Sequence, residues 1–206
     1  MKKNSDLKNK IITVSALGPR PLWEVKSHGK ETVDIMIRHW QEQLSQVTPD
    51  NPDLIVLPEA CDRFPTHTMT ERKEYYHFRG DKILNFFCEY AVKNKCYIVY
   101  SAVRETYDGT YRNSTQLINR QGTVCGIYNK NHLVPRETTE GDILCGKDAP
   151  VFTTDFGTVA MAICFDLNFH ELLEKYAQQR PDIILFSSMY HGGLMQNYWA
   201  YYCQAH

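Results

Sequence analysis

The sequence predicts an α/β protein in which two strand–helix–strand units form one layered structure. In the first unit, the apolar residues 53–57 and 96–103 are strand candidates, and residues 82–92 between them repeat apolar side chains at helical spacing. In the second unit, residues 159–163 and 182–188 are apolar runs of strand type on either side of a helical segment. Strands that alternate with helices favour a sheet covered by helices, so we expect both units to belong to one α/β core.

The remaining elements follow from periodicity and from turn residues. Apolar side chains of residues 30–47 fall on one helical face, and Pro49 ends that helix. Residues 62–79 are polar and predict a long loop with some helix. An Asp108-Gly109 turn predicts a hairpin, and residues 130–150 predict a long irregular segment of the kind that often carries function. The other expected strands lie at residues 10–17, 113–119 and 123–129.

Composition favours a single cytoplasmic domain over residues 1–206. With 43% hydrophobic residues, the chain can bury one sizeable core. The net charge of -1 and the lack of a long apolar run argue against nucleic-acid and membrane partners. Seven cysteines without a CxxC pair indicate free thiols in a reducing compartment. The histidines show no zinc-site spacing, so we expect no metal.

Three polar residues fall at the ends of predicted strands: Glu59, Lys130 and Cys164. Taken singly, each has an ordinary explanation, as a cap, a solvated strand end and a small buried apolar residue. Together they would suit attack on an amide. The carboxylate would take the thiol proton, and the ammonium would stabilise an oxyanion. We also expect the following helix, capped by Asn168, to favour the thiolate through its N-terminus.

Three sequence blocks carry a family resemblance. LIVLPEA at 54–60, YNKNHLVP at 128–135 and VAMAICFDLNFHEL at 159–172 resemble the signature blocks of the nitrilase, or carbon–nitrogen hydrolase, superfamily. DFG at 155–157 and SSMYHGG at 187–193 are of the same type. The resemblance implies an α-β-β-α sandwich, a Glu-Lys-Cys triad, a cysteine thioester intermediate and no cofactor. The chain stops at His206 within a predicted helix, so the resemblance also implies a sandwich that is incomplete at its C-terminus.

Further site residues are implied by the same resemblance. A second active-site glutamate is expected between the lysine and the cysteine, where Glu140, just before Gly141, fits better than Glu137. The implied substrate-binding residues are Phe165 through its backbone N–H, His132, which could orient the loop or Glu59, and Tyr190 at the pocket mouth. For His132, an ordinary hydrogen-bonded histidine is the alternative.

The expected partner is a small-molecule amide or nitrile. Asp166, Leu167 and Asn168 after the cysteine cannot clamp a carboxylate, which favours an uncharged or amine-bearing amide. Aromatic residues between 198 and 202, together with the habits of the family, predict a homo-oligomer. A catalytically inactive binding or scaffold subunit is the alternative. A papain-like Cys-His hydrolase is disfavoured because the CGSCW-type context is missing.

Overall fold

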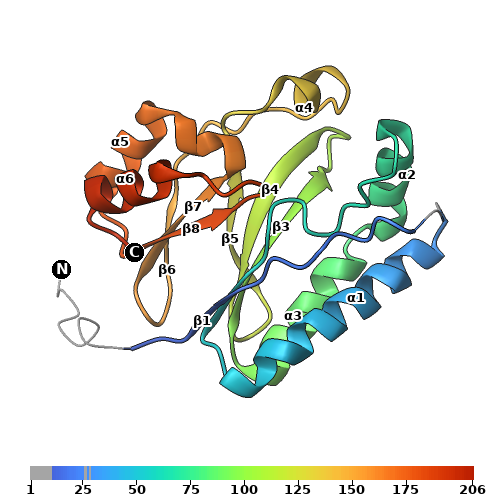
Figure 1. The fold of residues 1–206 in the computed structure, drawn as a ribbon, viewed down its shortest axis with the longest axis horizontal. Coiled ribbons are helices and arrows are strands. Elements are labelled where there is room, and N and C mark those ends of the chain that lie inside the picture. The colour runs from blue at the N-terminus through green and yellow to red at the C-terminus, as the bar shows by residue number, and fades with distance from the viewer. Residues whose placement is uncertain (1–10, 26, 28) are drawn as a thin grey trace.

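A computed structural model describes residues 11–25, 27 and 29–206 (Figure 1). The strands are β1 (Val14–Ala16), β2 (Leu54–Val56), β3 (Tyr97–Glu105), β4 (Tyr111–Ile118), β5 (Val124–Asn129), β6 (Val151–Thr153), β7 (Thr158–Ile163) and β8 (Ile183–Ser187). The helices are α1 (Glu31–Val47), α2 (Met69–Arg79), α3 (Lys82–Asn94), α4 (Pro135–Thr139), α5 (His170–Gln179) and α6 (Leu194–Cys203). Two 3₁₀ turns, η2 (Thr48–Asp50) and η3 (Cys164–Asn168), complete the elements.

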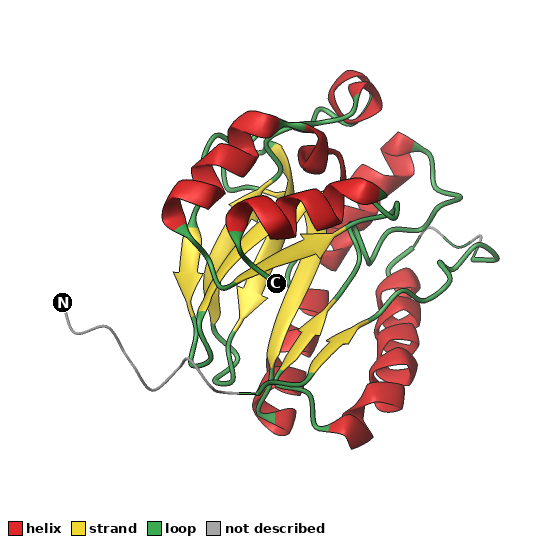
Figure 2. Ribbon diagram, turned by 60° about the vertical axis from the view of Figure 1, so that its left-hand side comes forward, coloured by secondary structure: helices red, strands yellow, loops and turns green. Residues whose placement is uncertain are grey.

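Two sheets lie between two layers of helices, which confirms the predicted α-β-β-α sandwich (Figures 1 and 2). The first sheet has the order β1-β2-β3-β4-β5, parallel over β1 to β3 and antiparallel from β3 to β5. The second sheet has the order β6-β7-β8, with β7 and β8 parallel. Helices α1 and α3 cover the outer face of the first sheet, and α5 and α6 cover that of the second.

Strand β3 shows how one sequence serves two cores. Successive side chains of a strand point to opposite faces. Ile98 and Tyr100 therefore pack with the α1 and α3 layer, where Trp40 and Phe87 meet edge to face at 5.8 Å between ring centroids. Val99 points the other way, into the core between the sheets. A strand buried on both faces is expected to be almost continuously apolar. Residues 97–103 are all buried, and Ser101 is their one small polar residue.

The second sheet brings three differences from the sequence prediction. Helix α5 is preceded by η3 and has Phe169 rather than Asn168 at its N-cap, because the Asn168 side chain donates to the Phe165 carbonyl at 3.0 Å. Helix α6 ends at Cys203, so the chain does not stop within a helix. The last residue, His206, instead exchanges backbone hydrogen bonds of 3.0 and 2.8 Å with Asp182 and Ile184 at strand β8.

The first strand is shorter than expected. It covers Val14–Ala16, and Lys10 lies outside the described residues. None of the helices among residues 11–25, 27 and 29–206 is both long and apolar enough to cross a bilayer.

The sheet order also explains where the site forms. Two successive antiparallel pairings make β5 run in the same direction as β2 and β3, so the carboxyl ends of β2 and β5 share one edge.

Candidate active site

The three strand-end residues meet in the structure. Glu59 follows β2, Lys130 follows β5 directly, and Cys164 follows β7 directly. The ammonium of Lys130, which is 1% exposed, donates to Glu59 Oε1 at 2.7 Å. Glu59 is 7% exposed, so the pair lies out of bulk water. A buried pair of this kind is a weak source of stability but a strong constraint on geometry when both partners are held.

Cys164 sits at a sharp bend where β7 passes into η3. Its φ angle is 47°, in the left-handed region that residues with a side chain seldom adopt. Such strain often occurs at functional positions, where the surrounding structure holds the residue in place. The bend presents the sulfur at the end of the strand, beside Glu59 and Lys130.

The surroundings of Cys164 favour its neutral thiol over the thiolate, contrary to the sequence-based expectation. Burial raises the pKa of Cys164, and the negative charge of Glu59 raises it further. The neighbouring Ser188 and the charge of Lys130 lower the pKa but do not offset these effects. Glu59, the group that would accept the thiol proton, lines the same cavity as Cys164.

Lys130 is held in its charged form by two carboxylates. Burial alone would lower the pKa of this ammonium, but Glu59 and Glu137 together raise it. The ammonium donates to Glu137 Oε2 at 2.9 Å as well as to Glu59. Lys130 therefore offers a fixed positive charge to any oxyanion that forms beside Cys164.

Glu137, not Glu140, occupies the position beside the lysine. Glu140, the preferred candidate for the second active-site glutamate, instead pairs with Arg136 at 2.8 Å, and both of these side chains are largely exposed. Helix α4 accounts for the difference. Pro135 begins it, and the Glu137 carboxylate turns back to accept the Val134 N–H at 2.9 Å, which points it inward.

Asn113 on β4 joins the two glutamates and was missed from the sequence. Its Nδ2 donates to Glu59 Oε1 at 2.8 Å and to Glu137 Oε1 at 2.7 Å. The residue is 2% exposed, within a run of buried polar side chains over residues 113–116. That polar run inside an otherwise apolar sheet is the signal that could have indicated a site.

Asp166 ties the cysteine bend to the lysine loop. This fully buried carboxylate accepts the N–H of Ile163 at 3.1 Å and the hydroxyl of Tyr128 at 2.7 Å. It also accepts the backbone N–H of His132 at 2.9 Å and lies 3.0 Å from the same residue's Nδ1. The two segments that carry Cys164 and Lys130 are thus fixed to each other through one side chain.

His132 completes this connection. Its Nε2 lies 2.9 Å from Glu171, and its ring stacks on Phe169 with 3.7 Å between centroids. Burial lowers the pKa of His132, but its bonds to Asp166 and Glu171 outweigh burial and raise it. The side chain thus orients the loop after Lys130, one of the two roles considered for it, and makes no hydrogen bond to Glu59.

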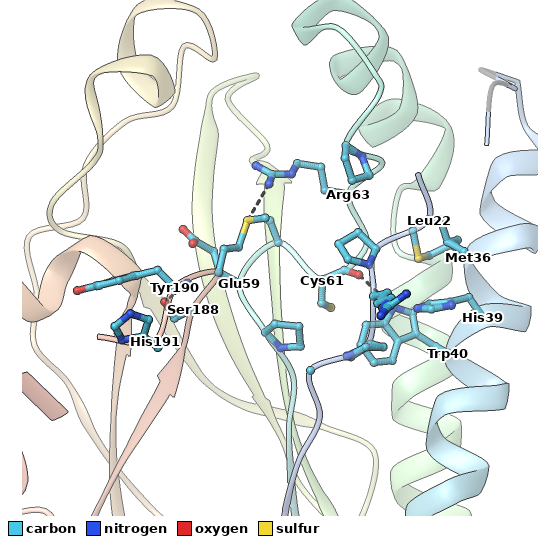
Figure 3. A pocket seen from close by; sticks show the side chains of 18 residues that line it. Leu22, Met36, His39, Trp40, Glu59, Cys61, Arg63, Ser188, Tyr190 and His191 are labelled. Atoms are coloured by element: carbon cyan, nitrogen blue, oxygen red, sulfur yellow. Dashed lines mark hydrogen bonds between the residues drawn. The ribbon is translucent and has the colours of Figure 1, made fainter. Parts of the chain in front are cut away.

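A cavity of about 400 Å³ contains Cys164, Glu59, Lys130, Glu137 and Asn113. The residues His132 and Tyr190, expected to bind substrate, do not line it, and neither does Phe165, for which the expected role is that of its backbone N–H. Tyr190 instead lines a second cavity of about 560 Å³, which shares Glu59 with the first and continues towards Trp40 (Figure 3). Both volumes suit small molecules.

The loop that carries Glu59 is anchored by a buried ion pair. Arg79 donates to Asp62 at 2.8 Å, and the hydroxyl of Tyr100 donates to the same carboxylate at 2.7 Å.

Across the described part of the chain, no group of three or more His, Cys, Asp or Glu side chains could hold a metal ion.

The four-layer fold with its buried glutamate, lysine and strand-end cysteine is that of a nitrilase-like protein. Comparison with known families agrees. The chain belongs to the carbon–nitrogen hydrolase family, whose sequence profile matches residues 13–206.

Individual relatives are distant in sequence. Over 153 residues the chain is 27% identical to Omega-amidase NIT2 of Danio rerio, which covers 71% of this chain and 54% of the relative. The structure of Saccharomyces cerevisiae Nit3, a nitrilase-superfamily member, superposes with a TM-score of 0.72 at 18% identity, covering 94% of this chain and 71% of that one. A glutamate-to-glutamine mutant of the Nesterenkonia sp. AN1 amidase, with acrylamide added at its active-site cysteine, superposes with a TM-score of 0.66 at 15% identity. That match covers 86% of this chain and 65% of the amidase chain.

The curated relatives are longer than the matching segment. The matched residues make up 23% of one bacterial hydrolase and 62% of another.

Proposed function

We propose that this chain hydrolyses non-peptide carbon–nitrogen bonds of small amides through a thioester on Cys164. The observation that carries the proposal is the buried contact of Lys130 with Glu59, in a cavity that Cys164 also lines. A nucleophile, a base and an oxyanion donor are therefore within one cavity.

In the first half-reaction, Sγ of Cys164 attacks the amide carbon while Glu59 accepts the thiol proton. The carbonyl oxygen becomes an oxyanion that Lys130 and the N–H of Phe165 stabilise. Collapse breaks the carbon–nitrogen bond, and Glu59 returns the proton to the departing amine, which leaves as ammonia from a primary amide. The acyl group remains as a thioester.

In the second half-reaction, water replaces the amine. Glu59 takes a proton from the water, whose oxygen attacks the thioester carbon. The carbon–sulfur bond then breaks, and the proton returns to the sulfur, which releases a carboxylic acid. Acid–base work of this kind contributes roughly 10²–10⁴-fold, and removal of one oxyanion donor costs roughly 10²–10³-fold. Because the surroundings of Cys164 favour the neutral thiol, the proposed mechanism couples the attack to proton transfer to Glu59.

Two of the relatives support an amidase. One is named an omega-amidase, and the amidase structure carries a covalent adduct at its active-site cysteine. From these relatives the proposal takes only the use of a cysteine as the nucleophile. It takes no particular substrate from them.

Ammonia release tests the proposal. A panel of aliphatic amides, N-carbamoyl compounds and nitriles should include at least one substrate for the wild-type chain. Cys164→Ala should abolish its turnover without loss of the fold by circular dichroism. Cys125→Ala, at an exposed cysteine, is the matched control and should retain activity. Near-normal turnover by Cys164→Ala would disprove the role of this cysteine, and a panel without any substrate would favour a binding subunit.

A further inference from the structure

The cavity that holds Cys164 is also lined by three arginines. Arg63 comes from the loop after β2, Arg72 from α2 and Arg136 from α4. None of them takes part in the chemistry proposed above. Three guanidinium groups from three separate elements around one small cavity call for an explanation, since like charges brought together destabilise a fold.

Arg72 is the most informative of the three. It is 9% exposed, and one of its terminal nitrogens donates to the Pro65 carbonyl at 3.2 Å. Its Nε is buried and has no hydrogen-bond partner in the structure. Burying a charged group without a counter-charge is unfavourable, so such an arginine is suited to a ligand that supplies the missing acceptor.

Arg63 is also without an acidic partner. A terminal nitrogen contacts the sulfur of Met189 at 2.7 Å (Figure 3). A thioether is a weak acceptor, so an incoming anion could displace it readily. Within the described residues, no ion pair joins Arg63 or Arg72 to a carboxylate, whereas Arg136 is paired with Glu140 at the surface.

The charged groups of the cavity therefore form two sets, one around Lys130 and one made of the arginines. At the reacting end, Lys130 faces the carboxylates of Glu59 and Glu137, and the neutral thiol of Cys164 is favoured over the thiolate. Two carboxylates there face one ammonium, so that end does not favour a carboxylate of the substrate.

Arg63 and Arg72 line the same cavity. Burial lowers the pKa of Arg72, and the charges of Arg63 and Arg136 lower it further, although Glu140 acts in the opposite direction. A bound anion would relieve the repulsion among these like charges.

We propose that Arg63 and Arg72, with Arg136 at the rim, bind a carboxylate carried by the substrate. The preferred substrates are then small amides or carbamoyl compounds that bear a carboxylate, on either their acyl or their amine part. This inference rests on the proposed function, and it replaces the uncharged or amine-bearing substrate that the residues after Cys164 suggest. The cavity of about 400 Å³ has room for such a molecule.

Binding of the anion can be measured without turnover. Glutarate is the probe, and pentane-1,5-diol is its neutral counterpart of the same length. Glutarate should slow alkylation of Cys164 by iodoacetamide, followed by peptide mass spectrometry, and the diol should not. Because a hydrogen bond to a charged group changes affinity by about tenfold or more, Arg72→Met should need at least about ten times more glutarate for equal protection.

Two further variants guard against a folding artefact. Arg63→Met lies at a less buried position and should also weaken protection, so the test survives if Arg72→Met does not fold. Arg38→Met, at an exposed site on α1, is the matched control and should protect as the wild type does. Equal protection by glutarate in all folded variants, or no protection in the wild type, would overturn the inference.

Turnover separates this inference from the proposed function. Succinamate should exceed its methyl ester in kcat/KM by about tenfold or more, and the ratio should fall towards one in Arg63→Met. N-carbamoylglycine against its methyl ester shows whether the carboxylate belongs to the amine part instead. If neutral amides are hydrolysed as well as both anions, the carboxylate site is wrong and the hydrolase proposal stands. If glutarate protects in an arginine-dependent way but no compound is hydrolysed, the anion site stands and the hydrolase proposal fails.

Discussion

Replacing Glu137 with glutamine tests the arrangement around Lys130. The carboxylate accepts from Lys130 and from the Val134 N–H at Oε2, both at 2.9 Å, and from Asn113 at Oε1, at 2.7 Å. A glutamine offers one acceptor oxygen and one amino group, so at least one of these donors would face another donor. A hydrogen bond to a charged group contributes about 1.5–3 kcal/mol, and about 1.4 kcal/mol corresponds to tenfold. We therefore expect kcat/KM to fall about ten- to hundredfold.

Glu140→Gln is the control, three positions along the same segment. Its carboxylate contacts Arg136 in solvent, and exposed pairs of this kind contribute little, about 0–1 kcal/mol. Steady-state ammonia release from a neutral amide should therefore remain within a few-fold of wild type. In both variants iodoacetamide should still modify Cys164, since Glu59 is unchanged. Normal turnover by Glu137→Gln together with impaired turnover by Glu140→Gln would refute the reasoning.

Three other predictions follow from single contacts. Asn113→Ala removes both hydrogen bonds that join the glutamates, and kcat in the ammonia assay should fall about tenfold or more with little change in KM. The pKa of His132 is raised in the folded chain, so its protonated form stabilises the fold. This contribution is fully present below about pH 6.5, and it is lost as the pH rises through the folded pKa. Thermal melts of His132→Gln should lack that loss. We predict a homo-oligomer because Tyr201 is 84% exposed, and a clean monomer by light scattering would contradict it.

The strand-end residues could be predicted because their signal is local. Glu59, Lys130 and Cys164 each follow an apolar run, and the ends of such runs are visible in the sequence. The choice between Glu137 and Glu140 depends on the short helix Pro135–Thr139, which lies in a segment that the sequence predicts to be irregular. Pro135 at the first turn, with a glutamate two positions later, is a helix-start signal that would have pointed to Glu137.

Other properties of the site depend on contacts between distant segments. The raised pKa of Cys164 arises from burial between the two sheets and from Glu59, which is far away in the sequence. The sequence, in which this cysteine precedes a helix, predicts the opposite effect, a lowered pKa. The three arginines come from separate elements at positions 63, 72 and 136, so only the folded chain shows that they line one cavity.

Trapping the covalent intermediate tests the central proposal most directly. The wild-type chain is mixed with the best amide of the panel, quenched in acid and digested, and the peptides are weighed by mass spectrometry. We predict that the peptide with Cys164 gains the mass of the acyl group, that the six other cysteines do not, and that hydroxylamine removes the added mass. Turnover with no acyl group on Cys164, or with the acyl group on another residue, would contradict the proposed mechanism.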